Sequence, residues 1–232
     1  MANASELGRA DPTTRLAATS ARRSVAEETI SGRLLLMSFT RRTQLAVLLA
    51  AGAGRRFSGP THKLLAPLQN RPLVSHALTA MRDAHIGAMA VVTGAVDLSE
   101  PLAGILSDVT VLQNPEWSSG QHSSVATAIR FAHQHGFDDV IIGLGDQPFI
   151  SPEAWQLVAS TEGDIVVATY DGVRGNPVKL AQPVWNEFLG LTSDPDAGAR
   201  TLMHLHPELV RQVACKGVSA DIDTSEDLSQ WT

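Results

Sequence analysis

Cysteine is almost absent from this chain of 232 residues, which contains Cys215 alone. A single thiol excludes an internal disulfide, and it fits a protein of a reducing compartment such as the cytoplasm. We therefore expect a cytoplasmic protein in which Cys215 packs as a small buried hydrophobe. The eight histidines are not accompanied by a Cys/His ligand cluster, so the sequence predicts no zinc site of that kind.

Excess basic charge is also lacking. Lys and Arg number 18 against 24 Asp and Glu, which gives a formal net charge of -6 and a pI near 5.7. This balance argues against a general surface for nucleic acid or for an anionic membrane. No apolar run approaches the roughly 18 residues of a membrane span. The basic residues are therefore expected to act locally, on a small ligand.

Two common glycine signatures are missing as well. A dinucleotide fingerprint needs a third small residue where Phe57 stands. A P-loop needs Gly-Lys-Ser/Thr, whereas Gly59 is followed by Pro60 and Thr61. No serine stands in a Gly-x-Ser-x-Gly elbow, so the sequence gives no support to a serine hydrolase.

The first 40 residues differ in composition from the remainder. They are rich in Ala, Ser, Thr and Arg and show little periodicity, which predicts a disordered N-terminal extension over residues 1–40. Residues 41–232 are expected to form one domain, because 44% hydrophobic content supports a single good core. Met37 stands just before the folded pattern begins, so we hypothesise that translation starts there and that residues 1–36 are a gene-start artefact.

From residue 44 onward, apolar runs alternate with segments of helical periodicity. This alternation predicts a single-domain α/β fold with a Rossmann-like, doubly wound and mostly parallel sheet, whose ligands bind beyond the carboxyl ends of the strands. Strands are expected at residues 44–49, 88–93, 109–112, 140–144, 164–169 and 178–180, with a last strand ending at 221–223. Helices are expected at residues 72–84, 98–106, 123–133, 185–189, 197–204 and 225–230, and residues 172–177 are expected to be a loop.

The strand at residues 44–49 leads into a glycine-containing turn and then into basic residues. Gly52 and Gly54 allow close approach of the backbone, so that amide groups can point at phosphate oxygens. Arg55, Arg56 and Lys63 add fixed positive charge. The pattern predicts a nucleotide phosphate site, with an ordinary strand-to-helix turn and exposed arginines as the alternative.

Aspartates are placed where a cation could be held over a bound triphosphate. Asp146 follows the apolar strand at residues 140–144, and Asp221 and Asp223 stand two positions apart on an extended segment, which would put their side chains on one face. Each also has a plain alternative, a turn aspartate for Asp146 and a polar strand end or helix cap for the other two.

A second loop carries Asn114, Gly120, Ser123 and Ser124 at the start of an expected helix. Gly120 permits close approach, and a serine hydroxyl with backbone amides at a helix start can contact a base, ribose or phosphate. Helix capping alone is an equally good explanation of the serines.

Taken together, these motifs resemble those of the MobA-like nucleotidyltransferases over about residues 44–230, with the molybdenum cofactor cytidylyltransferases as the most similar branch. The resemblance implies a nucleotide-diphospho-sugar transferase (GT-A-like) fold. The motifs are Leu49-Ala50-Ala51-Gly52-x-Gly54-Arg55-Arg56-Phe57, His62-Lys63-Leu64-Leu65, Arg71-Pro72-Leu73, Asn114-Pro115 with Gly120 and Ser124, Gly145-Asp146-Gln147-Pro148, Gly175-Asn176-Pro177 and Asp221-Ile222-Asp223-Thr224-x-Glu226-Asp227-Leu228.

The resemblance also implies roles for individual residues. Arg55, Lys63 and Asp146 would be catalytic, and Mg²⁺ would be held by Asp146, Asp221 and Asp223. Ala50-Ala51 is similar to the cytidylyl branch, whereas guanylyl relatives tend to carry Gly-Gly, so CTP is the expected nucleotide. The expected nucleotide-binding residues are Leu49, Ala50, Ala51, Gly52, Gly54, Arg55, Arg56, Lys63, Asn114, Gly120 and Ser124. The expected acceptor-binding residues are Arg174, Gly175, Asn176 and Pro177, and Asn176 departs from the histidine that cytidylyltransferases often carry.

The activity implied is Mg²⁺-dependent transfer of CMP from CTP to molybdopterin with release of pyrophosphate, for delivery to a molybdenum hydroxylase client. Two other functions stay open. Some actinobacterial members of the MobA-like group are described as NAD(P)H-dependent reductases of a quinone-like, nicotine-derived pigment, and a non-catalytic carrier of molybdenum cofactor would bind the pterin without turnover.

Overall fold

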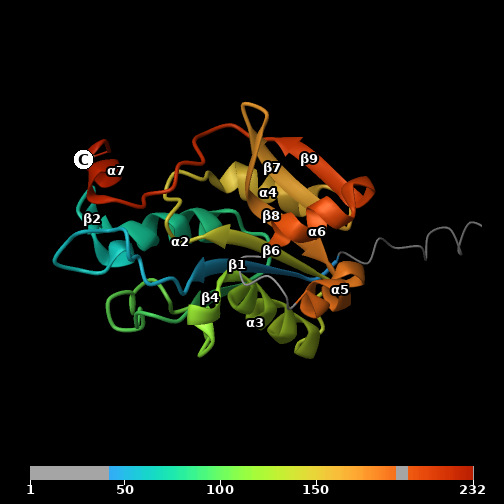
Figure 1. The fold of residues 1–232 in the computed structure, drawn as a ribbon, viewed down its shortest axis with the longest axis horizontal. Helices are drawn as coiled ribbons and strands as arrows, with labels where there is room; N and C mark the ends of the chain where they lie inside the picture. Colours follow the sequence, from blue (N-terminus) through green and yellow to red (C-terminus); the bar gives the residue numbers. More distant parts are fainter. Residues whose placement is uncertain (1–41, 192–197, 232) are drawn as a thin grey trace, which may run out of the picture. The chain divides into compact units, whose positions relative to one another are not determined.

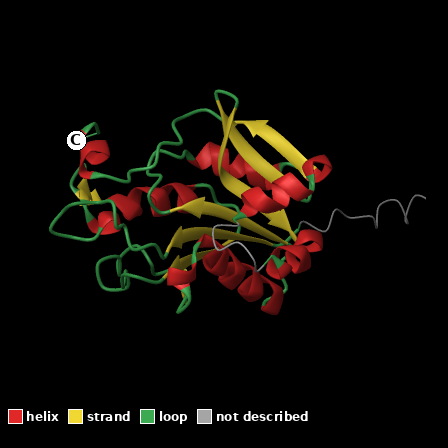
Figure 2. Ribbon diagram, viewed as in Figure 1, coloured by secondary structure: helices red, strands yellow, loops and turns green. Residues whose placement is uncertain are grey.

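The computed structural model describes residues 42–191 and 198–231. The predicted extension over residues 1–40 and the predicted start at Met37 fall outside the described residues. Figures 1 and 2 show a twisted sheet with helices on both faces, as expected for a doubly wound α/β domain. None of the helices in the described ranges has the length and apolar character that a membrane crossing requires.

Seven strands form the sheet, in the spatial order β5-β4-β1-β6-β8-β7-β9. Strand β8 is antiparallel to its neighbours β6 and β7, and the other strand pairs of this sheet are parallel. The predicted α/β fold with a mostly parallel sheet is therefore confirmed. The strands are β1 (Gln44–Ala50), β4 (Ala88–Thr93), β5 (Thr110–Gln113), β6 (Asp139–Leu144), β7 (Ile165–Tyr170), β8 (Val173–Ala181) and β9 (Val210–Ala214), and a separate small hairpin pairs β2 (Pro67–Leu68) with β3 (Arg71–Pro72).

The central strand β1 shows why helices cover both faces of the sheet. Ala46 and Leu48 pack into one apolar cluster, and Leu45 and Val47 pack into the other, so every side chain of this run is buried. Helices α2 (Leu73–Asp83) and α4 (Pro152–Ser160) complete the first cluster, and α3 (Gln121–Gln134), α5 (Trp185–Gly190) and α6 (Ala199–Leu205) complete the second. The remaining short helices are η1 (Lys63–Leu65), η2 (Trp117–Ser119), η3 (Gln182–Val184), η4 (Pro207–Leu209) and α7 (Ser225–Ser229).

The sheet aligns the carboxyl ends of its central strands. Leu49 of β1 is paired with Leu144 of β6, and Ala50 is paired with Thr93 of β4. The amide of Gly145 then donates to the carbonyl of Leu49 at 2.9 Å, which joins the loops that follow β1 and β6. Residues that follow these strands therefore meet at one edge of the sheet.

Three predicted elements are wrong. Residues 98–106 were predicted as a helix, but residues 99–105 form consecutive turns, because Pro101 lacks an amide donor and Gly104 favours chain reversal. Leu98 and Leu102 of this segment are buried. Residues 172–177, predicted as a loop, lie mostly within β8, which begins at Val173. Residues 221–223 are not part of a strand.

Among the longer elements, α4 and β9 were not predicted. Helix α4 carries an ordinary start signal, since the Ser151 hydroxyl accepts from the amide of Ala154 and Pro152 follows at the first helical position. Strand β9 is an edge strand whose residues are exposed or partly buried, so its apolar pattern is weak. Cys215, which follows β9, is half-buried, and burial raises the pKa of its thiol.

Candidate active site

Three charged residues from distant parts of the chain meet beyond the carboxyl ends of β1 and β6. The ammonium Nζ of Lys63 donates to Asp146 Oδ2 at 2.8 Å and to Asp223 Oδ1 at 2.9 Å. The Lys63 side chain is only 9% exposed, against 24% for Asp146 and 22% for Asp223. The second oxygen of Asp223 pairs with the Arg56 guanidinium at 2.8 Å. The two carboxylates thus converge on one buried cation.

The two carboxylates keep the side chain of Lys63 protonated. Burial by itself would lower the pKa of the Lys63 ammonium, but the carboxylates of Asp146 and Asp223 outweigh it and hold this pKa above its ordinary value. Lys63 is therefore positively charged at neutral pH and retains charge to offer a phosphate.

The position of Asp223 follows from the residues on either side of it. Ile222 is fully buried, and its amide donates to the carbonyl of Asp146 at 3.0 Å. Thr224 then caps α7 in a capping box with Asp227, whose carboxylate accepts from the amides of Asp223 and Thr224. An apolar anchor and a helix cap therefore fix the Asp223 carboxylate beside Lys63.

The first cavity, about 550 Å³ in volume, lies between the loop that follows β1 and the start of α3. Gly54 has φ of 60°, and a Cβ at this position would lie 3.0 Å from Lys63 Cβ. His62 holds the same loop, because its ring contacts the carbonyl of Gly52 at 3.1 Å and accepts from the amide of Leu64. The lining residues are Leu49, Ala51, Gly52, Ala53, Gly54, Arg55, Arg56, Trp117, Ser118, Gly120, Gln121, Ser124, Leu144 and Asp146.

Most of the predicted nucleotide-binding residues line this cavity, and three do not. Ala50 is 2% exposed and packs in the core beneath the loop. Lys63 lies behind the loop and reaches Asp146. Asn114 is buried, and its side-chain amide donates to Ser123 Oγ at 2.8 Å and to Ser124 Oγ at 2.9 Å. Asn114 therefore orients Ser124, which does line the cavity.

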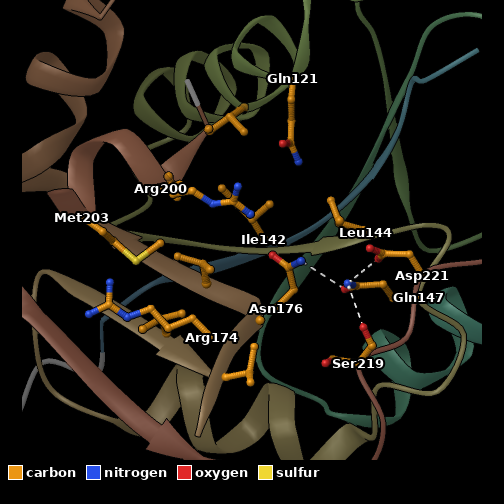
Figure 3. A pocket seen from close by; sticks show the side chains of 17 residues that line it. Gln121, Ile142, Leu144, Gln147, Arg174, Asn176, Arg200, Met203, Ser219 and Asp221 are labelled. Carbon is orange, nitrogen blue, oxygen red and sulfur yellow. Dashed lines mark hydrogen bonds between the residues drawn. The ribbon is translucent and has the colours of Figure 1, made fainter. Parts of the chain in front are cut away.

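A second cavity of about 540 Å³ adjoins the first, since Gln121 and Leu144 line both (Figure 3). Arg174, Gly175 and Asn176 of β8 contribute to its wall, whereas Pro177, joined to Asn176 by a cis peptide bond, does not. The other lining residues are Val125, Ile142, Gln147, Val167, Val173, Val178, Gly198, Ala199, Arg200, Met203, Ser219 and Asp221.

Asp221 belongs to this second cavity, and its side chain does not share the contacts of Asp223. Gln147 Nε2 donates to Asp221 Oδ1 at 2.7 Å, and Asn176 Nδ2 donates to Gln147 Oε1 at 3.1 Å. Asp221 is reached from the cavity, yet the surrounding walls desolvate it and raise the pKa of its carboxyl. The hydrogen bond from Gln147 opposes this rise in pKa, and the charges of Asp146 and Asp223 add to it. Asp221 and Asp223 therefore have different hydrogen-bond partners, and their joint action on one cation stays a prediction.

The residues present fit a divalent cation held by two carboxylates. Across the described ranges, no group of three His, Cys, Asp or Glu side chains is arranged as a metal ligand set. Asp146 and Asp223 nevertheless converge on one cationic atom. Magnesium is commonly bound through one or two carboxylates together with phosphate oxygens and water. Of the three predicted ligands, the structure thus brings together Asp146 and Asp223.

Several site residues escaped prediction, namely Ala53, Ser118 and Leu144 in the first cavity, and Gln147 and Arg200 in the second. The sequence did offer an indication for Gln147, because it directly follows Asp146 in the motif Gly145-Asp146-Gln147-Pro148. For Arg200 there was none, because the topology alone brings α6 over this edge of the sheet.

The α/β sheet thus carries two adjoining cavities beyond its strand ends, and the first is lined by Arg55, Arg56 and Asp146. Ligands of open α/β sheets commonly bind in this position. The chain belongs to the MobA-like NTP transferase family, whose domain model matches residues 46–212.

One curated relative is the nicotine blue oxidoreductase of Paenarthrobacter nicotinovorans, which is 31% identical over 194 residues, covering 78% of this chain and 93% of that protein. Among solved structures, a Methanothermobacter nucleotidyl transferase, Mth528, matches with a TM-score of 0.69 at 24% identity, covering 81% of this chain and 95% of that one. Rv0371c from Mycobacterium tuberculosis H37Rv also matches with a TM-score of 0.69 at 24% identity, covering 82% and 98%. A further structure of Rv0371c is a complex with manganese. These structures share the nucleotidyltransferase fold.

Proposed function

We propose that this protein transfers CMP from CTP to the phosphate of molybdopterin and releases pyrophosphate. The observation that carries the proposal is the convergence of Lys63 and Asp223 on Asp146, which lines the first cavity. This cavity adjoins the second one at Gln121 and Leu144. A triphosphate in the first cavity and an acceptor in the second would meet near these three groups.

In the proposed reaction, an oxygen of the acceptor phosphate attacks the α-phosphorus of CTP. A new P–O bond forms, the bond from the α-phosphorus to the bridging oxygen breaks, and pyrophosphate leaves with that electron pair. This chemistry requires positioning and neutralisation of charge more than a protein nucleophile. Lys63 and the arginines Arg55 and Arg56 supply fixed positive charge, and the amides near Gly52 and Gly54 supply donors for the phosphates.

Asp146 and Asp223 are the residues that would hold Mg²⁺. Bound there, the cation would neutralise negative charge on the phosphates of the nucleotide. The manganese complex of Rv0371c, a protein of the same fold, supports the proposal of a divalent cation here.

The choice of CTP rests on the loop that follows β1. Ala51 lines the first cavity, whereas Ala50 does not. The methyl group of Ala51 narrows the space that a glycine would leave open, so a pyrimidine is favoured over a purine. The choice of molybdopterin rests on the resemblance of the motifs, and Arg174, Gly175 and Asn176 in the second cavity are the proposed acceptor contacts. A molybdenum hydroxylase would be the client for the product.

The test is a panel of the four ribonucleoside triphosphates, assayed for pyrophosphate release with and without molybdenum cofactor. We expect release with CTP only when the cofactor and Mg²⁺ are both present. Turnover with a different triphosphate or acceptor would refute the specific assignment. Binding of the cofactor without turnover of any triphosphate would favour a carrier protein.

One observation favours a second function. The nicotine blue oxidoreductase is 31% identical and is covered over 93% of its length, so reduction of a quinone-like pigment by NAD(P)H is the alternative. Oxidation of NADPH in the presence of a quinone-like dye, with no pyrophosphate release from CTP, would support that function instead.

A further inference from the structure

Two aspartates that stand two positions apart have separate surroundings. Asp223 gives one oxygen to Lys63 and the other to Arg56. Asp221 instead accepts from Gln147 through Oδ1, and within the described residues its Oδ2 accepts no hydrogen bond. Ile222, which stands between them, is buried in the core. Asp223 therefore contacts the buried ammonium of Lys63, whereas Asp221 lines the second cavity.

Gln147 fixes the direction of Asp221. Its side chain is nearly buried, and Nε2 donates both to Asp221 Oδ1 and to the carbonyl of Ser219 at 3.4 Å. Its Oε1 accepts from Asn176, whose own carbonyl accepts from the Tyr170 hydroxyl at 2.8 Å. Because both ends of the Gln147 amide have partners, the amide cannot reverse without losing bonds. Figure 3 shows the hydrogen bonds that join Gln147 to Asn176, Asp221 and Ser219 on one side of the cavity.

The second cavity is lined by basic residues at the end that lies away from Asp221. Figure 3 shows Arg200 and Arg174 away from Gln147 and Asp221, with Met203 near them and Ile142 between the two ends. Neither arginine forms an ion pair or hydrogen bond with another described residue, so each has a guanidinium to offer an anionic ligand. An occupant would thus meet hydrogen-bond acceptors at one end and positive charge at the other.

We propose that Asp221 is an acceptor-binding residue, which receives a hydrogen bond from an N–H or O–H group of the acceptor, and that Gln147 is the residue that positions it. Asp221 is then not a ligand of the cation held by Asp146 and Asp223. The acceptor is then an anionic molecule with N–H or O–H groups along one edge. This edge would donate to Asp221, and an anionic oxygen of the same molecule would lie near Arg200. This inference rests on the proposed function, because it assigns the second cavity to the acceptor.

The first experiment separates the two aspartates by their effect on the cation. Binding of Mn²⁺ in the presence of CTP is measured by electron paramagnetic resonance for the wild type, Asp223→Asn and Asp221→Asn. We expect Asp223→Asn to weaken Mn²⁺ binding by roughly ten-fold or more, and Asp221→Asn to leave it within about two-fold. Equal losses in the two variants would overturn the inference, since Asp221 would then be a cation ligand.

The second experiment measures the acceptor directly. Pyrophosphate release from CTP is followed as the concentration of molybdenum cofactor is varied. Asp221→Asn and Gln147→Leu are expected to raise the KM for the cofactor by about ten-fold, with the KM for CTP little changed, because a hydrogen bond to a charged group is lost or misdirected. An exposed aspartate provides the matched control, and Asp83→Asn is expected to change neither constant.

The outcomes distinguish this inference from the proposed function. A wild-type protein that neither binds Mn²⁺ with CTP nor releases pyrophosphate refutes the proposed function and the inference with it. A wild-type protein that does both, while Asp221→Asn and Gln147→Leu keep a normal KM for the cofactor, refutes the inference alone.

Discussion

Lys63 Nζ lies 2.8 Å from Asp146 Oδ2, although the two residues stand 83 positions apart in the chain. Lys63 begins the short helix η1, and Asp146 follows β6, so the ion pair joins the loop that carries the glycines to the strand end that carries the carboxylate. With Asp223 it forms a charged cluster beside the first cavity, which Asp146 lines.

Replacing Asp146 by Asn should abolish turnover without unfolding the protein. The Asp146 side chain is partly exposed, so its loss leaves the core intact, but the site loses one of two carboxylates that converge on the cation position. We expect kcat for pyrophosphate release to fall on the order of a thousand-fold. The control is Asp171→Asn, at a turn with φ of 50° that Asn tolerates. A variant Asp146→Asn that turns over at a near-normal rate would contradict the assignment.

The two glycines of the first loop should respond differently to alanine. Gly54 has a positive φ and no room beside Lys63 Cβ, whereas a Cβ on Gly52 would meet nothing within 4 Å. Gly54→Ala should lower the free energy of unfolding by about 1–2 kcal/mol, and Gly52→Ala should change it by less than about 0.5 kcal/mol. Urea denaturation measures the free energy of unfolding of both variants. Equal values for the two would show that the backbone at position 54 does not require glycine.

Replacing Ala51 by Gly should weaken the discrimination between CTP and GTP. Ala51 lines the first cavity, and removal of its methyl group makes room for a larger base. Ala50→Gly serves as the control, because Ala50 is buried in the core and should cost about 1 kcal/mol of stability without a change in nucleotide preference. The ratio of kcat/KM for the two nucleotides is the measurement. A larger effect at Ala50 than at Ala51 would refute the explanation.

His62 should make the stability of the first loop depend on pH. Burial lowers the pKa of the His62 imidazole below 6.5, and the charge of Lys63 lowers it further, against opposing bonds to backbone carbonyls. The folded state therefore disfavours protonation, so the stabilisation is complete above about pH 6.5 and is lost as the pH falls through the folded-state pKa. Protonation removes the Nδ1 acceptor for the Leu64 amide.

The comparison for this prediction is His62→Asn, since Asn can still cap η1 but does not titrate in this range. The free energy of unfolding is measured for both proteins between about pH 8 and pH 5. The wild type should lose more stability than the variant on the acid side. Parallel curves would exclude His62 as the titrating group.

The sequence was most informative about residues that directly follow a buried strand, because the end of the strand determines their position. Asp146 and the glycine loop follow apolar strands, and parallel strands place their carboxyl ends along one edge, so their proximity was predictable. The acceptor segment was harder, because Gly175 and Pro177 are typical of a loop, yet the segment lies in β8 with a register shift opposite Val167 and Ala168 of β7.

Asp221 shows a different limit. The rule that alternate side chains share one face applies only to a regular strand, and residues 221–223 do not form one. They are held in place by the burial of Ile222 and by the hydrogen bond from its amide to the carbonyl of Asp146. The contact of Gln147 with Asn176 depends on the antiparallel placement of β8 beside β6. Such long-range pairing leaves no local pattern in the sequence.

The most direct test of nucleotidyl transfer follows the phosphorus atoms of CTP. The protein is incubated with Mg²⁺, molybdenum cofactor and CTP labelled either at the α-phosphate or at the γ-phosphate, and the products are separated. We expect the α-label on the cofactor and the γ-label in the released pyrophosphate. Label that stays on CTP, while the same preparation oxidises NADPH with a quinone-like dye, would contradict this expectation.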